Sequence, residues 1–353
     1  MEMTKNYNYK LLNFNNYNLN ESKSTRETLI INNNNSCLNH AKHISIDDAL
    51  NKFSVNSFNS NDSFSSNEIN NSSFNYSNII DNEDYYENPE KNYLNEIYNE
   101  LLIEEKNNEF FQSFNYMNYQ FELTPKIRAN LINYLYKISQ KFFFKDKTIY
   151  LSIQIIDRFL CKKKIDIYFL KLLGVSSLFI SSKFNEIFYP EISNWMFYLK
   201  ENYSTEQFLY MEYFILDSLN YNILPLYPLS FFEIINEKIK LNKYEFYLGL
   251  LIIEISQFEY NMIHFKSSII VQSIVYLILL LKKRKNQKID IDNIMLNIFP
   301  ELKKNKKNII CINNCCKLIS DLLDNINSEI FNIIYKKFSS KEYYNVTDFS
   351  VFM

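Results

Sequence analysis

Lys183 and Glu212 are the two residues whose chemistry departs most from their surroundings in this chain. Each is a charge within a helix-period apolar run, LLGVSSLFISSKFNEIF (172–188) for the lysine and FLYMEYFILDSLNY (208–221) for the glutamate. A lone charge buried there would cost several kcal/mol. Two opposite charges on adjacent helices can neutralise each other and keep hydrogen-bonding capacity for a partner. The pair therefore indicates a docking surface for another protein.

Outside this pair, the sequence offers no constellation suited to catalysis or metal binding. Cys311, Cys315 and Cys316 are spaced i, i+4 and i+5, but no histidine lies near them. A helix places at most two of them on one face, so a tetrahedral zinc site would lack ligands. Only two glycines occur in the chain, which argues against a glycine-rich phosphate loop. We predict no catalytic residues, no metal and no cofactor.

Charge and cysteine content bear on partners and compartment. The 38 basic and 40 acidic residues give a net charge of −2, so we expect no general attraction to nucleic acid or membranes. The longest apolar run, 267–281, is interrupted by Gln272 and Ser273 and is shorter than the roughly 20 residues that span a bilayer. An odd number of cysteines, five, without a signal peptide fits a reducing compartment.

Composition divides the chain into a tail and a helical part. Residues 1–90 are rich in Asn and Ser and poor in hydrophobic periodicity, which predicts a disordered tail. A short helix is predicted at 92–108, because four of its residues recur on one helical face. These residues are Tyr93, Ile97, Leu101 and Glu104.

From residue 124 onward, the pattern predicts one helix after another, in two blocks. The start signals of the first block include Thr124 before Pro125, and Ser204 with Gln207, which form a capping box. The other starts are Asp146, Asp166 and Pro190, and the first-block helices are 124–141, 147–161, 166–187, one opened by Pro190, and 204–220. After Pro225 and Pro228, the second-block helices are 229–240, 243–257, 266–284, 290–298 and 306–326.

In each block the third helix is the long apolar one, which indicates an internal repeat of helical architecture. No stretch shows the sustained alternation of a strand, so we predict an all-α fold. The predicted division is a tail at 1–90, an N-terminal helix with the first five-helix block at 91–224, and the second block with a C-terminal segment at 225–353.

Several motifs make the chain resemble a cyclin, and most of all the mitotic B-type class. They are IRANLINYL (127–135), IIDRFL (155–160), LLGVSSLFISSKFNEIFYPEI (172–192), YMEYFILDSLNYNI (210–223) and EYNMIHFKSSII (259–270). The five positions that mark the first cyclin box are occupied as the family pattern asks, by Arg128, Asp157, Leu172, Lys183 and Glu212. The resemblance covers residues from about 90 to 353.

The resemblance implies two tandem five-helix cyclin boxes and a regulatory subunit that activates a cyclin-dependent Ser/Thr kinase in cell-cycle, mitotic control. Binding would rotate the kinase C-helix inward and complete the kinase's Lys–Glu ion pair. The residues it implies at the kinase interface are Lys183, Glu212, Phe184, Leu216, Tyr221, Tyr93 and Ile97. For Lys183 and Glu212 the alternative is an internal salt bridge, and for the apolar residues ordinary core packing. Arg128 and Asp157 are expected to pair structurally between the first two helices of the box.

The family's substrate-docking patch is altered in this chain. By the resemblance, Ile127, Leu131 and Tyr134 would line it and receive the arginine and leucine of substrate motifs. Two acidic positions of the family pattern are Asn133 and Lys137 here, so an incoming arginine would lose its charge partner and meet a like charge. We therefore predict weak or altered docking of arginine–leucine motifs.

The tail and one helix end carry possible addressing signals. Arg26, Leu29 and Asn34 fit the RxxLxxxxN destruction-box pattern, which would make the ubiquitin-ligase machinery a partner of the tail. Lys282-Lys283-Arg284-Lys285 fits a nuclear import signal, although cations at a helix C-terminus also complement its dipole. The expected location is the nucleus, the cytoplasm or both.

Two other functions stay open on the sequence. A transcription adaptor built on the same helical repeat would call for a basic face and often a zinc ribbon, which the net charge and the absence of a CxxC pair disfavour. The motifs are also compatible with a cyclin-box scaffold that binds a kinase without activating it.

Overall fold

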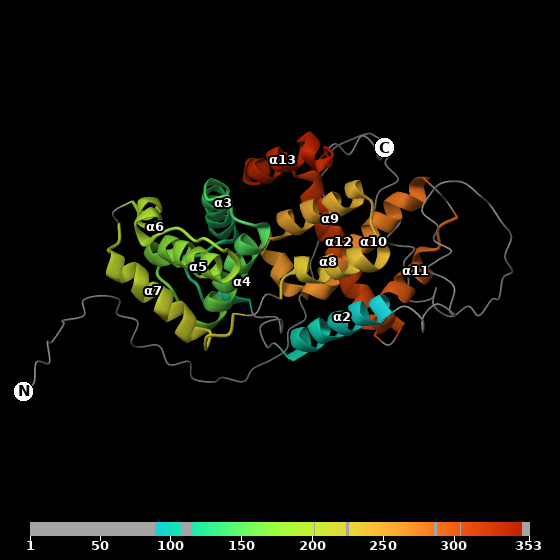
Figure 1. The fold of residues 1–353 in the computed structure, drawn as a ribbon, viewed down its shortest axis with the longest axis horizontal. Helices are drawn as coiled ribbons and strands as arrows, with labels where there is room; N and C mark the ends of the chain where they lie inside the picture. Colours follow the sequence, from blue (N-terminus) through green and yellow to red (C-terminus); the bar gives the residue numbers. More distant parts are fainter. Residues whose placement is uncertain are drawn as a thin grey trace, which may run out of the picture. The chain divides into compact units, whose positions relative to one another are not determined.

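The computed structural model describes residues 89–107, 115–200, 202–223, 226–285, 288–303 and 305–347. Within these ranges the chain is helical and contains no strand, as the sequence predicts (Figure 1). Nearly all of the predicted tail, residues 1–88, lies outside the described residues. The described helices all belong to one compact unit of the chain.

The first box consists of five α-helices arranged around a central one. The central helix, α5 (Leu170–Asn185), is buried over most of its length and contacts all four others. These are α3 (Pro125–Lys141), α4 (Asp146–Lys162), α6 (Ile192–Leu199) and α7 (Thr205–Ser218). At Gly174 of α5, an added Cβ would lie 2.8 Å from Leu131 of α3, so glycine permits the close approach of these helices.

The second box repeats this arrangement around α10 (Ser267–Lys285), as the two apolar third helices predict. The helices around it are α8 (Pro228–Ile239), α9 (Lys243–Ser256), α11 (Ile291–Ile298) and α12 (Lys306–Asp324). Gly249 again marks a close contact, since an added Cβ would come within 2.1 Å of the Phe232 ring. The core of both boxes is thus built on one buried helix with a ring of partners.

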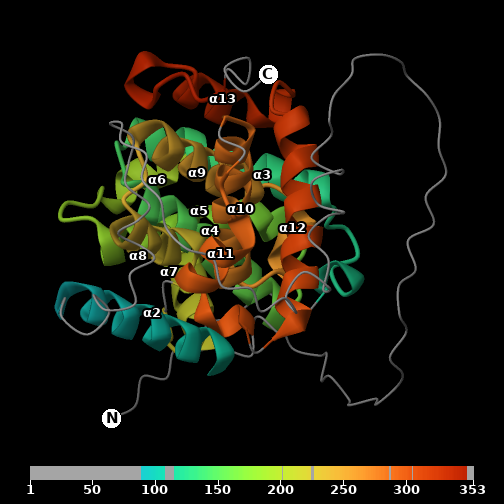
Figure 2. The same cartoon turned by 90° about the vertical axis from the view of Figure 1, so that its right-hand side faces the viewer.

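A helix flanks the boxes on each side. In both views, α2 (Pro89–Asn107) and α13 (Asn332–Phe338) lie at opposite sides of the two boxes (Figures 1 and 2). The N-terminal helix α2 packs on α8 of the second box. The C-terminal helix α13 contacts α9 of the second box and α3 of the first, so it bridges the two boxes.

Two of the five predicted start signals of the first box are confirmed. Thr124 caps α3 by accepting a hydrogen bond from the Ile127 backbone N–H, and Ser204 with Gln207 forms the predicted capping box of α7. Three predicted starts are shifted. Asp146 is the first residue of α4 rather than its cap, Asp166 caps a 3₁₀ turn that precedes α5, and α6 begins two residues after Pro190.

The packed face of α2 differs from the predicted one. Tyr98 and Glu105 are buried, whereas Tyr93 and Glu104 of the predicted face are exposed. Leu101 is the member of that face which packs against the core. The packed face is therefore rotated by about one residue, because Glu105 and the Tyr98 hydroxyl find polar partners inside the second box.

The segment Ile167–Asn185 is long and apolar enough to cross a membrane by composition alone. In the fold, 67% of its most apolar window is buried inside the protein, because it forms the centre of the first box.

Candidate partner-binding surface

Lys183 and Glu212 form the ion pair that the sequence predicts. Lys183 lies in the last turn of α5 and Glu212 in the middle of α7, and the Lys183 Nζ contacts the Glu212 Oε1. The ammonium also lies 4.2 Å from the centroid of the Phe179 ring, a cation–π contact. The side chain of Lys183 is 36% exposed and that of Glu212 13%. The pair is thus held by the fold but reachable from outside.

Large apolar side chains are exposed directly after this pair. Phe184 is 55% exposed, and the segment between α5 and α6 presents Ile187 at 81% and Phe188 at 90% exposure. Tyr189 is half exposed in the same segment. Contiguous exposed apolar surface of this kind marks an interaction site. We name Phe184, Ile187, Phe188 and Tyr189 the apolar segment.

The sequence prediction included Phe184 but not the other three members of the apolar segment. A signal for them was present, because Ile187, Phe188 and Tyr189 form an apolar run directly before Pro190, which prevents a helix from continuing through them. Apolar residues that no helix or strand buries lie at the surface. Such residues are typical of an interface that a partner covers.

The other predicted interface residues lie on α7 or just after it, and on α2. Tyr221 is 61% exposed and lies just after α7 in a left-handed backbone conformation. Leu216 of α7 is only partly exposed and packs against the core. It therefore contributes to the fold in addition to any contact with a partner. Tyr93 is exposed and Ile97 partly exposed on α2, the helix that packs on the second box rather than on α5 or α7.

Arg128 and Asp157 form the second predicted pair, and it is more extensive than predicted. Arg128 Nε donates to Asp157 Oδ1 at 2.8 Å, and Nη2 donates to Oδ2 at 2.6 Å. Tyr116 donates its hydroxyl to the same carboxylate at 2.7 Å. The remaining Arg128 nitrogen donates to the Gln257 carbonyl at 2.8 Å, which ties α3 to the second box. Burial alone would lower the pKa of Arg128, but the Asp157 carboxylate raises it above its ordinary value.

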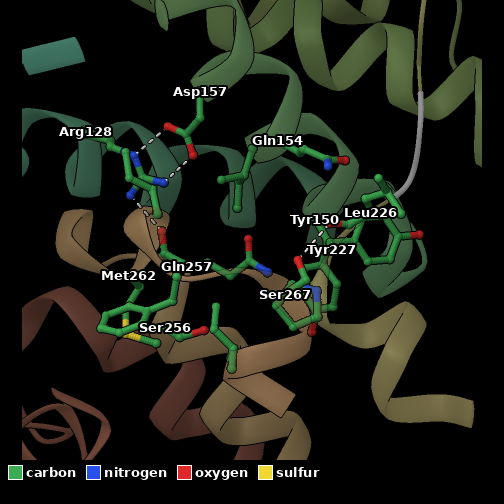
Figure 3. Close-up of a pocket in the computed structure, with 15 residues that line it drawn as sticks. Arg128, Tyr150, Gln154, Asp157, Leu226, Tyr227, Ser256, Gln257, Met262 and Ser267 are labelled. Carbon is green, nitrogen blue, oxygen red and sulfur yellow. Dashed lines mark hydrogen bonds and ion pairs between the residues drawn. The ribbon is translucent and has the colours of Figure 1, made fainter. Parts of the chain in front are cut away.

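This buried pair lies at the edge of a small cavity between the boxes, of about 80 Å³ (Figure 3). Figure 3 shows Gln154 and Tyr150 of α4 and Tyr227 beside the cavity. The cavity lining is mostly apolar, and the polar groups that Arg128 and Asp157 present are already bonded to each other. The pair therefore stabilises the fold and offers no free hydrogen-bonding face to a partner.

A third charged cluster, which sequence reasoning missed, joins the boxes at α13. Lys337 Nζ donates to Asp146 Oδ1 of α4 at 2.8 Å and to Glu254 Oε1 of α9 at 2.5 Å. Tyr150 also donates to Glu254, at 3.1 Å. Glu254 is fully buried, and burial raises its pKa to about 7 although Lys337 opposes the shift. A charge inside the apolar run of α9 was the available signal.

The patch on α3 is partly core. Leu131 is 7% exposed and packs against Gly174 of α5, so it contributes little exposed surface to the predicted patch, and its contact with a ligand stays a prediction. Ile127 and Tyr134 are partly exposed on the same helix, and Lys137 is exposed. Leu172, the remaining family position, is fully buried in α5 and serves the core.

The other sequence signals fall in three places. The destruction-box candidate at Arg26, Leu29 and Asn34 lies outside the described residues. In the basic run at the end of α10, Lys282 pairs with Glu245 at 2.9 Å, a structural contact. Cys315 and Cys316 are buried in α12 and Cys311 is exposed. Within the described residues, no group of three potential metal ligands occurs.

Comparison with known proteins matches both boxes. The model of the cyclin N-terminal domain matches residues 96–224, and the model of the cyclin C-terminal domain matches residues 226–351. The herpesvirus saimiri viral cyclin has the same fold, with a TM-score of 0.51 and 17% identity over 63% of this chain and 97% of the viral protein. The chain belongs to the cyclin family.

Its curated relatives include B-type cyclins. It is 29% identical to the G2/mitotic-specific cyclin-B1 of Oryzias latipes over 239 residues, 65% of this chain and 58% of that protein. It is 39% identical to the G2/mitotic-specific cyclin-B1 of Caenorhabditis elegans over 102 residues, 29% of this chain and 28% of that protein. The chain thus spans less than two thirds of the length of these relatives.

Proposed function

We propose that this cyclin binds and activates a cyclin-dependent Ser/Thr kinase through Lys183, Glu212 and the apolar segment. The observation that carries the proposal is the preformed Lys183–Glu212 pair, partly exposed beside strongly exposed apolar side chains. Interfaces derive most of their affinity from a few large side chains that become fully desolvated on binding. Phe184, Ile187 and Phe188 are side chains of this kind.

The ion pair contributes specificity on this surface. A lysine ammonium has three donors, and the Glu212 carboxylate has two acceptor oxygens, so pairing leaves capacity on both groups. Backbone carbonyl and N–H groups of a partner can use this capacity. Because the contact with Phe179 and the helix packing hold Lys183 in place before binding, little side-chain entropy is lost in the complex.

Activation follows from preference for one kinase conformation. A kinase is active when its C-helix lies inward and its Lys–Glu ion pair is formed. A cyclin that binds this conformation more tightly than the inactive one shifts the population by its difference in affinity. In the proposed complex the apolar segment and the Lys183–Glu212 pair contact the C-helix. The cyclin then acts without a catalytic group of its own.

The more specific part of the proposal is that this cyclin acts in mitosis. It is supported by the G2/mitotic-specific names of the B-type relatives. Recognition of Arg26, Leu29 and Asn34 by ubiquitin-ligase machinery and a nuclear or cytoplasmic location belong to the same proposal. A Leu29→Ala variant that disappears at mitotic exit as fast as the wild type would contradict the destruction-box part.

The proposal is tested by kinase activation with purified proteins. Cyclin-dependent kinases from the organism that encodes this chain are mixed with it, and phosphorylation of a Ser/Thr-Pro substrate is measured. We expect activation by the wild type, and a loss of at least about tenfold for K183A and for E212A, as for an interface hot spot. The control E237A/K240A removes an exposed ion pair of α8 and is expected to activate normally.

Two outcomes would contradict the proposal in different ways. Full activation by K183A and E212A would show that kinase activation does not depend on this surface. Binding without activation by the wild type would favour the scaffold function. Circular dichroism of each variant establishes that any loss of activity is not a loss of fold.

A further inference from the structure

A cluster of lysines surrounds Tyr134 on the outer side of the first box. Lys171 at the start of α5 places its Nζ 4.8 Å from the centroid of the Tyr134 ring. Lys200, which directly follows α6, is close enough to Lys171 to act on its charge. Lys137 is exposed one helical turn after Tyr134 on the same face of α3. We name Tyr134, Lys137, Lys171 and Lys200 the lysine–tyrosine face.

The electrostatics of this face show positive charge without compensation. The pKa of Lys171 is lowered, first by partial burial and then by the charge of Lys200. Among the described residues, no carboxylate forms an ion pair with Lys137, Lys171 or Lys200. Glu201, the residue after Lys200, lies outside the described residues. The Lys171 and Lys200 ammonium groups therefore repel each other on this face.

The surrounding helices provide no acidic side chain. The sequences of α3, α5 and α6 contain no aspartate or glutamate. These helices form the floor and both sides of the lysine–tyrosine face, since α3 and α6 both pack on α5. An anion that binds there meets three cations and no like charge from these helices.

The face also has an apolar component and a fixed position. Ile127 lies two helical turns before Tyr134 on α3, and both are partly exposed. The Tyr134 hydroxyl donates to the Tyr198 carbonyl at 2.5 Å, which holds the ring between α3 and α6. The lysine–tyrosine face therefore offers a fixed aromatic ring and an aliphatic side chain beside three cations.

We propose that the lysine–tyrosine face docks an acidic peptide segment of a partner protein. Carboxylates of the segment pair with Lys137, Lys171 and Lys200, and an apolar side chain of the segment packs on Ile127 and the edge of Tyr134. Charge complementarity of this kind sets specificity and speeds association. A segment with an arginine at the same place is repelled, so the face selects partners opposite in charge to arginine–leucine motifs.

The observations favour a peptide over a nucleic acid. Single-stranded nucleic acids bind with bases stacked on free aromatic faces along a long basic groove. Here the Tyr134 ring carries the Lys171 ammonium over its face, and its hydroxyl is bonded to Tyr198. The net charge of the whole chain is −2, so the chain as a whole exerts no general attraction on nucleic acid.

The inference goes beyond kinase binding, because the lysine–tyrosine face shares no residue with the Lys183 surface. It can be tested on the cyclin alone, without a kinase. The two proposals therefore fail separately.

The test is a fluorescence-anisotropy titration of the full-length protein with three labelled probes. The first is the acidic peptide Asp-Glu-Leu-Asp-Phe-Glu-Asp, and the second has every acidic residue replaced by Lys. The third is a seven-nucleotide oligothymidylate. We expect the acidic peptide to bind best, and its affinity to fall as salt rises because the charges are exposed.

Variants locate the binding site. The double variant K171E/K200E is expected to lose at least about tenfold in affinity for the acidic peptide, because attractive charges become repulsive. The matched control K307E/K317E changes the net charge equally at exposed positions of α12 and is expected to bind like the wild type. K171Q/K200Q removes the charges without reversing them and is expected to lose affinity by a smaller factor.

Three results would overturn the proposal. They are tighter binding of the oligothymidylate than of the acidic peptide, equal loss of affinity in the α12 control, and binding of the acidic peptide that K171E/K200E and K171Q/K200Q leave unchanged. Thermal unfolding of each variant shows that the protein titrated is folded.

Discussion

The Lys183–Glu212 and Arg128–Asp157 pairs use the same chemistry in opposite ways. Both join two helices of the first box through one cation and one carboxylate. The Arg128 and Asp157 side chains are 2% and 6% exposed and are bonded on all sides, whereas Lys183 is 36% exposed and has donors to spare. Surroundings, and not residue type, separate a pair that holds the fold from a pair that can meet a partner.

The largest expected effect is on the buried pair. Replacing Asp157 by Ala leaves the Arg128 guanidinium buried without its carboxylate, and removes the acceptor of Tyr116. We expect the free energy of unfolding to fall by about 3–5 kcal/mol, the usual loss when one partner of a buried pair is removed. Denaturant unfolding measures it, and a loss below 1 kcal/mol, roughly the surface-pair limit, would remove the contrast between the pairs.

The Lys337 cluster extends the comparison to the contact between boxes. K337A leaves Glu254 fully buried without its cation. We expect destabilisation of about 2–4 kcal/mol, somewhat less than for D157A because protonation of Glu254 can relieve part of the cost. K336A, which changes the neighbouring exposed lysine, is the control for loss of positive charge. Equal unfolding curves for K337A and K336A would contradict a structural role for the cluster.

The same cluster predicts a pH dependence. The folded pKa of Glu254 is raised from 4.5 to about 7, so the folded state holds this proton more tightly than the unfolded state. The contribution of this group to stability therefore falls as the pH rises from about 4.5 to about 7, and is level above that. We therefore expect the free energy of unfolding of the wild type to fall relative to that of E254Q as the pH rises through this range. A constant difference would contradict the raised pKa.

The smallest stability effect is expected at the exposed pair. E212A removes a partly exposed ion pair, and such pairs contribute about 0–1 kcal/mol. Chemical unfolding of E212A should therefore lie close to that of the wild type. A loss of several kcal/mol would place Lys183 and Glu212 in the same structural class as Arg128 and Asp157.

The sequence predicted the helices well, because their signals are local, whereas the pairing of Arg128 with Asp157 was predicted from the resemblance to cyclins. Periodicity, capping residues and charges within apolar runs are all read within one helix. The cluster at Lys337 escaped prediction because its partners lie 83 and 191 residues away, and their meeting depends on how the boxes pack. The packed face of α2 and the buried position of Leu131 were missed for the same reason, since the partner surface decides them.

The most direct test of the central claim is the affinity of the kinase for wild type, K183A and E212A by isothermal titration, with unfolding measured in parallel. The account predicts that the dissociation constant rises at least about tenfold while the free energy of unfolding changes by less than about 1 kcal/mol. Unchanged affinity together with a large loss of stability would contradict it, because the Lys183–Glu212 pair would then serve the fold and not the partner.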